Sequence, residues 1–428
     1  VYSSLTGKTI MRNRLQTRSI ICAALVGCCC TALSAEGPSD GGISDRARKL
    51  HAEAIVIDGH NDLPWLVRTN AGGDFSRYDI SERVLLPDRL RSGHTDIPRL
   101  RAGGVDAQFW SVYVPSDYAR KGKAAWTTME QIDLVHRMIK RYPETFELAL
   151  TADDIERIVA EGKIASLIGV EGGHSIENSM GVLRMFYRLG ARYMTLTHND
   201  TLDWADAATD EPRNGGLSPM GEEIVLEMNR LGMLVDISHV SVETMHDALR
   251  VSRAPVIASH SSAYALCPHP RNVPDEILRK LPENGGVIMV NFFSGFINPE
   301  AAGIMRESYE VRRKLQAEFP DDREFARAWD RWHREHPLPP GTLAQVVDHI
   351  DHIARTAGVD HVGLGSDFDG VSRTPEGLGD VSTFPSITEE LLKRGHSEEA
   401  VKKILGGNLL RVMRQAEEVA RKLQQDEN

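Results

Sequence analysis

Short apolar runs alternate with stretches of helical character along most of the sequence, and this alternation limits the possible folds more than any other feature. Eight runs are rich in Val, Ile and aromatic residues and are bounded by Gly, Pro or polar residues, which predicts strands. They are Ala54–Ile57, Ala107–Val114, Ala165–Val170, Tyr193–Thr197, Leu234–Ile237, Val256–Ala258, Val287–Asn291 and His361–Gly365. Strands that alternate with helices pair in parallel, so the sequence favours a closed (β/α)8 barrel of the TIM type. An open doubly wound sheet is the competing fold, but no glycine-rich phosphate loop follows the first run.

Capping residues mark several of the helices between these strands. Thr151 and Ser241 each precede a helical stretch and are expected N-caps. Ser218, followed by Pro at the first helical position, begins another helix, and Gly232 is its expected C-cap. These signals support the alternation of strands and helices that the barrel requires.

The segment Asn298–Pro340 interrupts the alternation between the seventh and eighth strands. It carries many charges together with Trp329 and Trp332, which predicts a helical insertion. A lid over the barrel and an oligomer contact, for example in a homodimer, are two roles such an insertion could have. A solvated surface helix is the alternative.

Length and charge narrow the class of protein. The 428 residues allow two average domains or one large barrel, and we expect a single barrel domain over residues 45–420. The net charge of −11 and the pI near 5.8 argue against nucleic-acid binding, which usually requires a basic face.

The N-terminal residues have the features of an export signal. From Met11, basic residues precede an apolar stretch, Ile20–Leu33, that is short for a membrane span. We therefore expect residues 1–35 to be upstream readthrough plus a leader. Leu-Val-Gly-Cys28 resembles a bacterial lipobox, which predicts an exported protein, periplasmic or anchored to the membrane as a lipoprotein through Cys28. Cleavage after Ala35 would instead secrete the protein, and a cytosolic protein with a misplaced start is the remaining alternative.

The cysteines are divided unevenly between the leader and the body of the chain. Four of the five lie in the leader, and Cys267 alone lies in the body. The body therefore forms no internal disulfide, and Cys267 is expected to be a buried, unreactive thiol rather than a nucleophile.

Side chains that bind metals or transfer protons follow six of the predicted strands. They are His60 and Asp62 after the first strand, Glu171 after the third, His198 after the fourth, His239 after the fifth, His260 after the sixth and Asp367 after the eighth. All carboxyl ends of the strands share one face of a parallel barrel, where such enzymes keep their chemistry. This set of His and carboxylate side chains suits a pair of Zn²⁺ ions that share and deprotonate a water.

Other candidates fit a ligand role less well. His349 and His352 lie in a helical stretch with Asp neighbours, and we expect surface or packing roles for them. Asp367-Phe368-Asp369-Gly370 resembles part of a calcium loop, but Leu378 occupies the position that requires a bidentate Glu.

Several longer motifs carry a family resemblance. In order along residues 54–370 they are DGHNDLP, HTDIPRLRAGGVDAQFWSVY, GVEGGHSIE, RYMTLTHND, DISHVSVETM, APVIASHSSAYALC, RNVPDE and GLGSDFDG. Together they resemble the membrane (renal) dipeptidase family of zinc peptidases, which is related in architecture to the amidohydrolases. The resemblance implies that His60 and Asp62 bind one zinc ion and His239 and His260 the other. Glu171 would bridge the two ions.

The resemblance also implies how the substrate is held. His198 would hold the scissile carbonyl and the tetrahedral intermediate, and Asp367 would hold the bridging water and handle the proton. Arg271 would bind the substrate's C-terminal carboxylate, for which a planar guanidinium is suited; from the sequence alone, a surface arginine is the alternative.

The expected activity is that of a dinuclear zinc dipeptidase of the membrane dipeptidase type, in which a metal-bridging hydroxide attacks dipeptides, L-Xaa-D-Xaa substrates included. One alternative is a barrel amidohydrolase or deacylase that acts on N-acyl amino acids or β-lactams. Another is a non-catalytic peptide-binding lipoprotein that has kept the fold.

Overall fold

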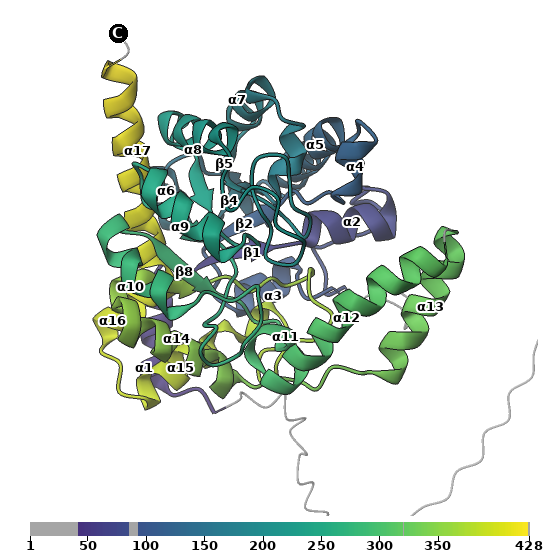
Figure 1. Ribbon diagram of the computed structural model, residues 1–428. Coiled ribbons are helices and arrows are strands. Elements are labelled where there is room, and N and C mark those ends of the chain that lie inside the picture. Colours follow the sequence, from purple (N-terminus) through teal and green to yellow (C-terminus); the bar gives the residue numbers. More distant parts are fainter. Residues whose placement is uncertain (1–41, 85–92, 320, 427–428) are drawn as a thin grey trace, which may run out of the picture. The chain divides into compact units, whose positions relative to one another are not determined.

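Nine parallel strands form the centre of the computed structural model, which describes residues 42–84, 93–319 and 321–426 (Figure 1). The strands are β1 Ile57–Asn61, β2 Ala107–Ser111, β3 Phe146–Leu148, β4 Ile164–Val170, β5 Ala191–Thr195, β6 Leu234–Asp236, β7 Ile257–Ala258, β8 Val287–Val290 and β9 Val362–Leu364. Their hydrogen-bonded order is β2-β1-β9-β8-β7-β6-β5-β4-β3, and β2 also pairs with β4. That extra pairing closes eight strands into a ring without β3, so the predicted (β/α)8 barrel is confirmed.

Most strand bounds differ from the prediction by a few residues, and two differences matter more. The first strand begins at Ile57 rather than Ala54, so His60 lies inside β1 instead of after it. The short strand β3 has no counterpart in the prediction. It pairs with the first half of β4, from Ile164 onward, whereas β5 pairs with the second half. Because β3 has only three residues and no β-branched side chain, it gives little local signal.

Helices surround the ring (Figure 1). The α-helices are α1 Asp45–Glu53, α2 Leu63–Ala71, α3 Ile97–Ala102, α4 Asp117–Arg120, α5 Ala124–Arg141, α6 Ala152–Ala160, α7 Met180–Arg188, α8 Pro219–Leu231, α9 Val242–Val251, α10 Asp275–Asn284, α11 Ser294–Ile297, α12 Pro299–Glu318, α13 Asp322–Glu335, α14 Leu343–Ala357, α15 Phe384–Lys393, α16 Glu398–Lys402 and α17 Asn408–Asp426. The expected caps are confirmed: the side chains of Thr151, Ser218 and Ser241 accept hydrogen bonds from the first turns of α6, α8 and α9. Gly232 ends α8 in the left-handed conformation.

Successive residues of a strand point to opposite sides of the barrel wall, and each side has its own core. Phe109 and Leu167 belong to a cluster inside the barrel, while their neighbours Trp110 and Ile168 belong to the larger cluster between strands and helices. The inner cluster also includes apolar residues at the start of α17, such as Leu409. The interior is therefore a packed core, and the chemistry is confined to the carboxyl ends of the strands.

The predicted insertion is helical. Helices α12 and α13 lie between β8 and β9 and form a helical hairpin that projects beside the barrel (Figure 1). Asn298 caps α12 through its side-chain oxygen. A small apolar cluster of Phe293, Phe296 and Val371, with Met305 and Leu338 packed against it, joins the base of this hairpin to the barrel.

No helix in the described ranges is long and apolar enough to cross a membrane. The expected leader, including Cys28, lies outside the described residues, and the described residues from Ile43 onward form one compact unit.

Candidate active site

The structure brings the side chains predicted from the strand ends together in one buried cluster. This histidine–carboxylate cluster consists of His60, Asp62, Glu171, His198, His239, His260 and Asp367. Within it, three overlapping groups each have their nitrogen and oxygen atoms within 4.8 Å of one another. The groups are His60 with Glu171 and His260, Glu171 with His198 and His239, and His60 with Asp62 and Asp367.

Glu171 lies at the centre of the cluster. Its Oε2 is 3.5 Å from His60 Nε2, while its Oε1 is 3.2 Å from His239 Nε2 and 3.6 Å from His260 Nε2. The Ser111 hydroxyl donates to Oε2 at 3.0 Å and so fixes the carboxylate. Since the two oxygens of Glu171 face different sets of imidazoles, this carboxylate can serve two cations at once.

Several nitrogen and oxygen atoms of the cluster lack hydrogen-bond partners in the part of the chain that the structure describes, which is the arrangement expected of metal ligands. His60 Nε2 and Asp62 Oδ1 are buried and have no hydrogen-bond partner among the described residues. Buried polar atoms are normally paired, so orphaned ones need an explanation. His239 Nε2 and His260 Nε2 are only 2.9 Å apart, and both face the centre of the cluster. Imidazole nitrogens and carboxylate oxygens form the donor set that suits Zn²⁺.

Burial also sets the protonation of three of the histidines. It lowers the pKa of His198 to about 3, with the charges of His174 and Arg271 acting in the same direction. The pKa values of His239 and His260 lie well below their ordinary value, again mainly because both rings are buried. These three imidazoles are therefore neutral at pH 7 and have lone pairs to offer.

Asp367 sits at the edge of the cluster. Its pKa is raised to about 8, mainly by burial and also by the nearby carboxylates of Asp62 and Glu171, while His60 opposes the shift. Asn291 Nδ2 donates to Asp367 Oδ2 at 2.8 Å. The backbone of Asp367 has φ of 60°, a left-handed conformation that is uncommon outside glycine and frequent at functional sites. A carboxyl group held this way can exchange a proton near neutral pH.

Arg271 is buried beside the same cluster, which excludes the alternative of a surface arginine. The residue is only 1% exposed. Its Nη1 and Nη2 reach the Ser261 hydroxyl and the His260 carbonyl, both at 3.3 Å, while Nε has no partner. Within the described ranges no carboxylate forms an ion pair with it. A buried guanidinium without a counter-ion is costly, so a ligand carboxylate is the natural partner.

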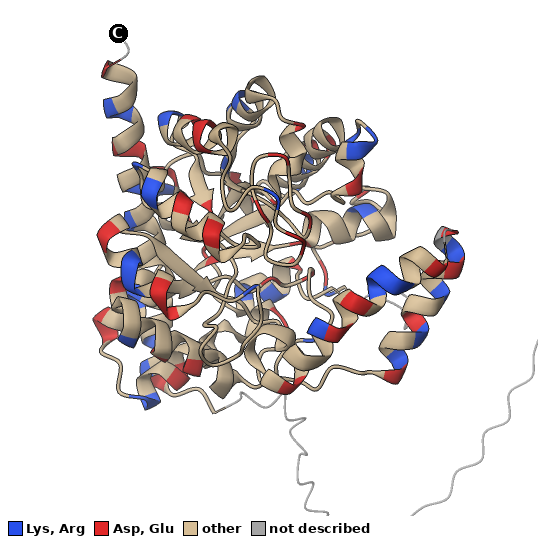
Figure 2. Cartoon of the chain, in the orientation of Figure 1, with Lys and Arg blue, Asp and Glu red and all other residues tan. Residues whose placement is uncertain are grey.

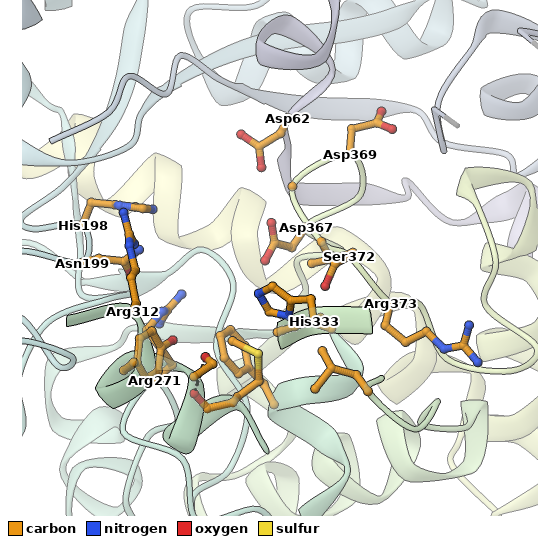
Figure 3. Close-up of a pocket in the computed structure, with 18 of the residues that line it drawn as sticks. Asp62, His198, Asn199, Arg271, Arg312, His333, Asp367, Asp369, Ser372 and Arg373 are labelled. Carbon is orange, nitrogen blue, oxygen red and sulfur yellow. Dashed lines mark hydrogen bonds between the residues drawn. The ribbon is translucent and has the colours of Figure 1, made fainter. Parts of the chain in front are cut away.

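A cavity of about 830 Å³ opens above the cluster, and Asp62, Glu171, His198, Arg271 and Asp367 line its floor (Figure 3). The helical hairpin provides the opposite wall, with Met305, Tyr309, Arg312, Trp329 and His333 among its contributions. In Figure 3, the His333 ring points towards Asp367. Charged residues of both signs are mixed along α12 and α13 (Figure 2). Because residues of the hairpin line the cavity, the insertion is part of the site and more than a solvated surface helix.

Several residues of the site were absent from the sequence prediction. Asn291 ends the seventh predicted strand, the position at which six other strands carry a functional side chain, so the strand-end pattern contained the signal for it. Ser111 and Tyr193, whose hydroxyl is 2.7 Å from His60 Nδ1, lie within the predicted strands among apolar residues and gave no signal. The wall residues Trp329 and His333 depend on how the hairpin folds back, which local sequence does not specify.

The residues judged unlike ligands lie away from the cluster. His349 is buried and packs: its Nδ1 accepts from the Ala263 N–H at 3.0 Å. His352 is half-buried and pairs with Asp275 at 2.7 Å. Cys267 is buried, and burial raises the pKa of its thiol to about 12, as expected for an unreactive cysteine.

Comparison with known proteins points to a metallopeptidase family, in agreement with a site whose side chains can bind metal. Residues 44–427 match the sequence profile of the family described as membrane dipeptidase (peptidase family M19). The chain is 41% identical to dipeptidase verJ of Clonostachys rogersoniana over 390 residues, which cover 89% of each chain. It is 42% identical to dipeptidase tcpJ of Claviceps purpurea over 402 residues, which cover 91% of this chain and 84% of that protein.

Solved structures share the fold. The probable dipeptidase PvdM from Pseudomonas aeruginosa has a TM-score of 0.75 at 23% identity, covering 88% of this chain and 98% of its own. A metallopeptidase from Rhodobacter sphaeroides, liganded with a phosphinate mimic of the dipeptide L-Ala-D-Ala, has a TM-score of 0.68 at 23% identity, covering 85% and 99%. The family match covers residues 44–427, and the relatives are more than 40% identical over most of their length; the chain therefore belongs to the membrane dipeptidase family of metallopeptidases.

Proposed function

We propose that this protein hydrolyses the peptide bond of dipeptides with two zinc ions bound by His60, Asp62, Glu171, His239 and His260. The observation that carries the proposal is the pairing of two features in one cavity. A cluster with orphaned ligand atoms lies beside Arg271, a buried cation that lacks a carboxylate partner. An enzyme that recognises the end of its substrate requires both.

Arg271 would set the position of the substrate. Its guanidinium can accept a terminal carboxylate in two parallel hydrogen bonds, which fixes the orientation of the C-terminal residue. Because Nη2 already contacts the carbonyl of His260, the anchored substrate lies directly beside the cluster. A peptide bond one residue from the carboxylate would then face Glu171 and His198, whereas longer peptides would have to extend into the hairpin wall.

The residues around the peptide bond divide the remaining work. Zinc held in the cluster would supply Lewis acidity, polarising the carbonyl and lowering the pKa of a bound water. His198 is neutral and lines the cavity, so its ring can hydrogen-bond the substrate oxygen as negative charge develops there. Asp367, oriented by Asn291, can accept a proton and return it to the departing amine.

A hydrolysis screen tests this function. It would compare L-Xaa-L-Xaa and L-Xaa-D-Xaa dipeptides, tripeptides and N-acyl amino acids, each with and without a chelator. The D-residues are included because a protein of the same fold binds a mimic of L-Ala-D-Ala. We expect dipeptides alone to be cleaved, and only without the chelator. Preferred cleavage of N-acyl amino acids would indicate a deacylase, and metal binding without any turnover would indicate a peptide-binding protein.

A further inference from the structure

One imidazole of the cluster is backed by a buried carboxylate through a serine. His260 Nδ1 lies 2.8 Å from the Ser259 hydroxyl, and that hydroxyl lies 2.6 Å from Asp236 Oδ2. Asp236 and Ser259 are fully buried and His260 is 1% exposed, so water does not compete for these contacts. Asp236 ends β6 and Ser259 follows β7, and neither residue touches the cavity.

Asp236 accepts four hydrogen bonds. Because its carboxylate oxygens are the acceptors, the partner group carries the proton in each of them. Its Oδ1 accepts from the backbone N–H groups of Ser238 at 3.0 Å and Ser259 at 2.8 Å. Its Oδ2 accepts from the hydroxyls of Thr195 and Ser259, both at 2.6 Å. The Ser259 proton is thus directed to Asp236, and its oxygen is left as an acceptor for the N–H of His260 Nδ1.

We infer that Asp236 and Ser259 are positioning residues that hold His260 in the Nδ1–H tautomer, so that its Nε2 lone pair faces the metal centre before any metal binds. The inference rests on the proposed function, because it gives His260 a metal to bind. A hydrogen bond from the distal nitrogen to a carboxylate-backed acceptor also makes an imidazole a stronger ligand.

The other two histidines proposed as zinc ligands, His60 and His239, lack such a device. His60 Nδ1 contacts only the Tyr193 hydroxyl, at 2.7 Å, and a phenol can either donate or accept. His239 Nδ1 is buried with no hydrogen-bond partner among the described residues. Only His260 therefore has a tautomer that the surrounding protein determines on its own.

The packing around Ser259 helps to hold the hydrogen-bonded chain Asp236–Ser259–His260 in place. A Cβ atom added to Gly365 would lie 1.9 Å from the Ser259 carbonyl oxygen, and one added to Gly59 would lie 2.8 Å from it. Gly59 in β1 and Gly365, directly after β9, thus allow the backbone of Ser259 to approach both segments closely. Such close packing holds a hydroxyl to a single geometry.

The order of zinc affinities in three variants tests the inference. In Asp236→Asn, the two backbone N–H groups still require an oxygen at Oδ1, so the amide NH2 must face Ser259. The serine would then donate to His260 Nδ1 and drive the ring to the Nε2–H tautomer, which cannot bind zinc. Ser259→Ala leaves Nδ1 without a partner but the tautomer free. Thr195→Val, the matched control, removes an equivalent hydrogen bond to Asp236 Oδ2 but keeps the carboxylate, Ser259 and His260.

We expect zinc affinity, measured by competition with a chromogenic chelator, to fall about a hundredfold in Asp236→Asn and about tenfold in Ser259→Ala, and to stay within about twofold in Thr195→Val. A purely structural role predicts the reverse order, since Asn is the closest match in shape to Asp. Equal affinities in Asp236→Asn and Thr195→Val would overturn the inference.

The tautomer can also be read in the unmodified protein, which covers the case in which a variant does not fold. In metal-free protein labelled with ¹⁵N-histidine, the ring signal that disappears in His260→Ala should show a protonated Nδ1. A protonated Nε2 would overturn the inference. Failure of the unmodified protein to bind zinc would instead contradict the proposed function, so the two ideas fail in different ways.

Discussion

The floor and the wall of the cavity are built in opposite ways. The floor is formed by the histidine–carboxylate cluster, whose side chains lie at the ends of six strands. Five of its seven residues are buried, and hydrogen bonds hold two of its carboxylates, Ser111 to Glu171 and Asn291 to Asp367. The wall is a helical hairpin in which no described side chain of α13 is fully buried. Its aromatic residues lie in a row, with Phe325 and Trp329 stacked at 6.2 Å and Trp329 and Trp332 at 5.9 Å.

This difference separates two tasks. A group that takes part in bond breaking must be held to within a fraction of an ångström, which the closed barrel provides. A surface that selects side chains needs area and shape, which a stacked aromatic face provides. We therefore expect substitutions in the floor to change the reaction rate or metal binding, and substitutions in the wall to change substrate affinity.

The largest effect should follow substitution at the centre of the floor. Glu171→Gln keeps the size of the side chain but removes a charge and places an NH2 group where a cation requires an oxygen. We expect loss of bound zinc, by elemental analysis, and a fall of about a thousandfold or more in kcat/KM. Ser111→Ala is the matched control: it removes the hydrogen bond to Oε2 and leaves the charge, and should cost about tenfold or less. Full zinc content and rate in Glu171→Gln would show that this carboxylate bridges nothing.

The second effect concerns the edge of the floor at Arg271. If its guanidinium binds the terminal carboxylate, the enzyme should discriminate against C-terminal amides, since losing such a charge-assisted pair costs about 2–5 kcal/mol. That corresponds to roughly thirtyfold to several thousandfold in kcat/KM. Arg271→Lys should recover little, because a point charge does not reproduce two parallel hydrogen bonds.

Arg271→Ala provides the control for this comparison. It should retain its zinc content while losing activity on free dipeptides, and the gap between acid and amide substrates should narrow. Equal rates on a dipeptide and its amide with the unmodified enzyme would rule out this role for Arg271.

The floor could be predicted from the sequence much more fully than the wall. His60, Glu171 and His260 each follow an apolar run, and a parallel barrel brings such positions to one face whatever the details of packing. The contacts that support them were less accessible: Ser259 and Asp236 look like ordinary polar residues beside strands until the register places them together. The barrel's start was also misplaced, because Asp58 and His60 are polar and yet continue β1.

The wall shows where sequence reasoning ends. The charges and tryptophans of residues 298–340 predicted helices, and helices are present. They did not predict which face of α13 would meet the cavity, because Trp329 and Trp332 are only three positions apart and both lie on its apolar side. That choice depends on the angle at which the hairpin leaves α11, which is a tertiary property.

The third effect sharpens the comparison within the wall. Trp329 lines the active-site cavity, whereas Trp332 lines a second groove, formed by residues of α12 and α13 that include Leu315. Trp329→Ala should raise KM by roughly tenfold, in line with the loss of a large apolar contact, and leave zinc content unchanged. Trp332→Ala removes the same side chain from the same stack and should leave KM within about twofold. Equal effects of both substitutions would mean that the wall acts through its stability rather than through contact with the substrate.

The last prediction concerns stability rather than activity, at the place where floor and wall are joined. His349 Nδ1 accepts from the Ala263 N–H, in the loop that carries His260, and its Nε2 lies 3.4 Å from the carbonyl of Ile297, at the base of the hairpin. Burial lowers the pKa of His349 from 6.5 to about 4, so the folded protein holds the neutral ring while the unfolded chain binds a proton between these values. Stability from this residue is therefore complete above pH 6.5 and is lost as the pH falls towards 4, by up to about 3 kcal/mol.

His349→Asn isolates this contribution, because its side-chain oxygen can still accept from Ala263 but the amide does not titrate. Denaturant unfolding of metal-free protein at pH 7 and pH 4.5 excludes any effect of zinc release on the result. Many buried groups titrate over this interval, so the informative quantity is the difference between the two proteins. We expect the variant to be less stable than the unmodified protein at pH 7 and to lose less stability on acidification, by about 2–3 kcal/mol. If both proteins lose the same amount, the junction between floor and wall is not what acid weakens, and the two regions would be coupled through other contacts such as the apolar cluster around Phe296.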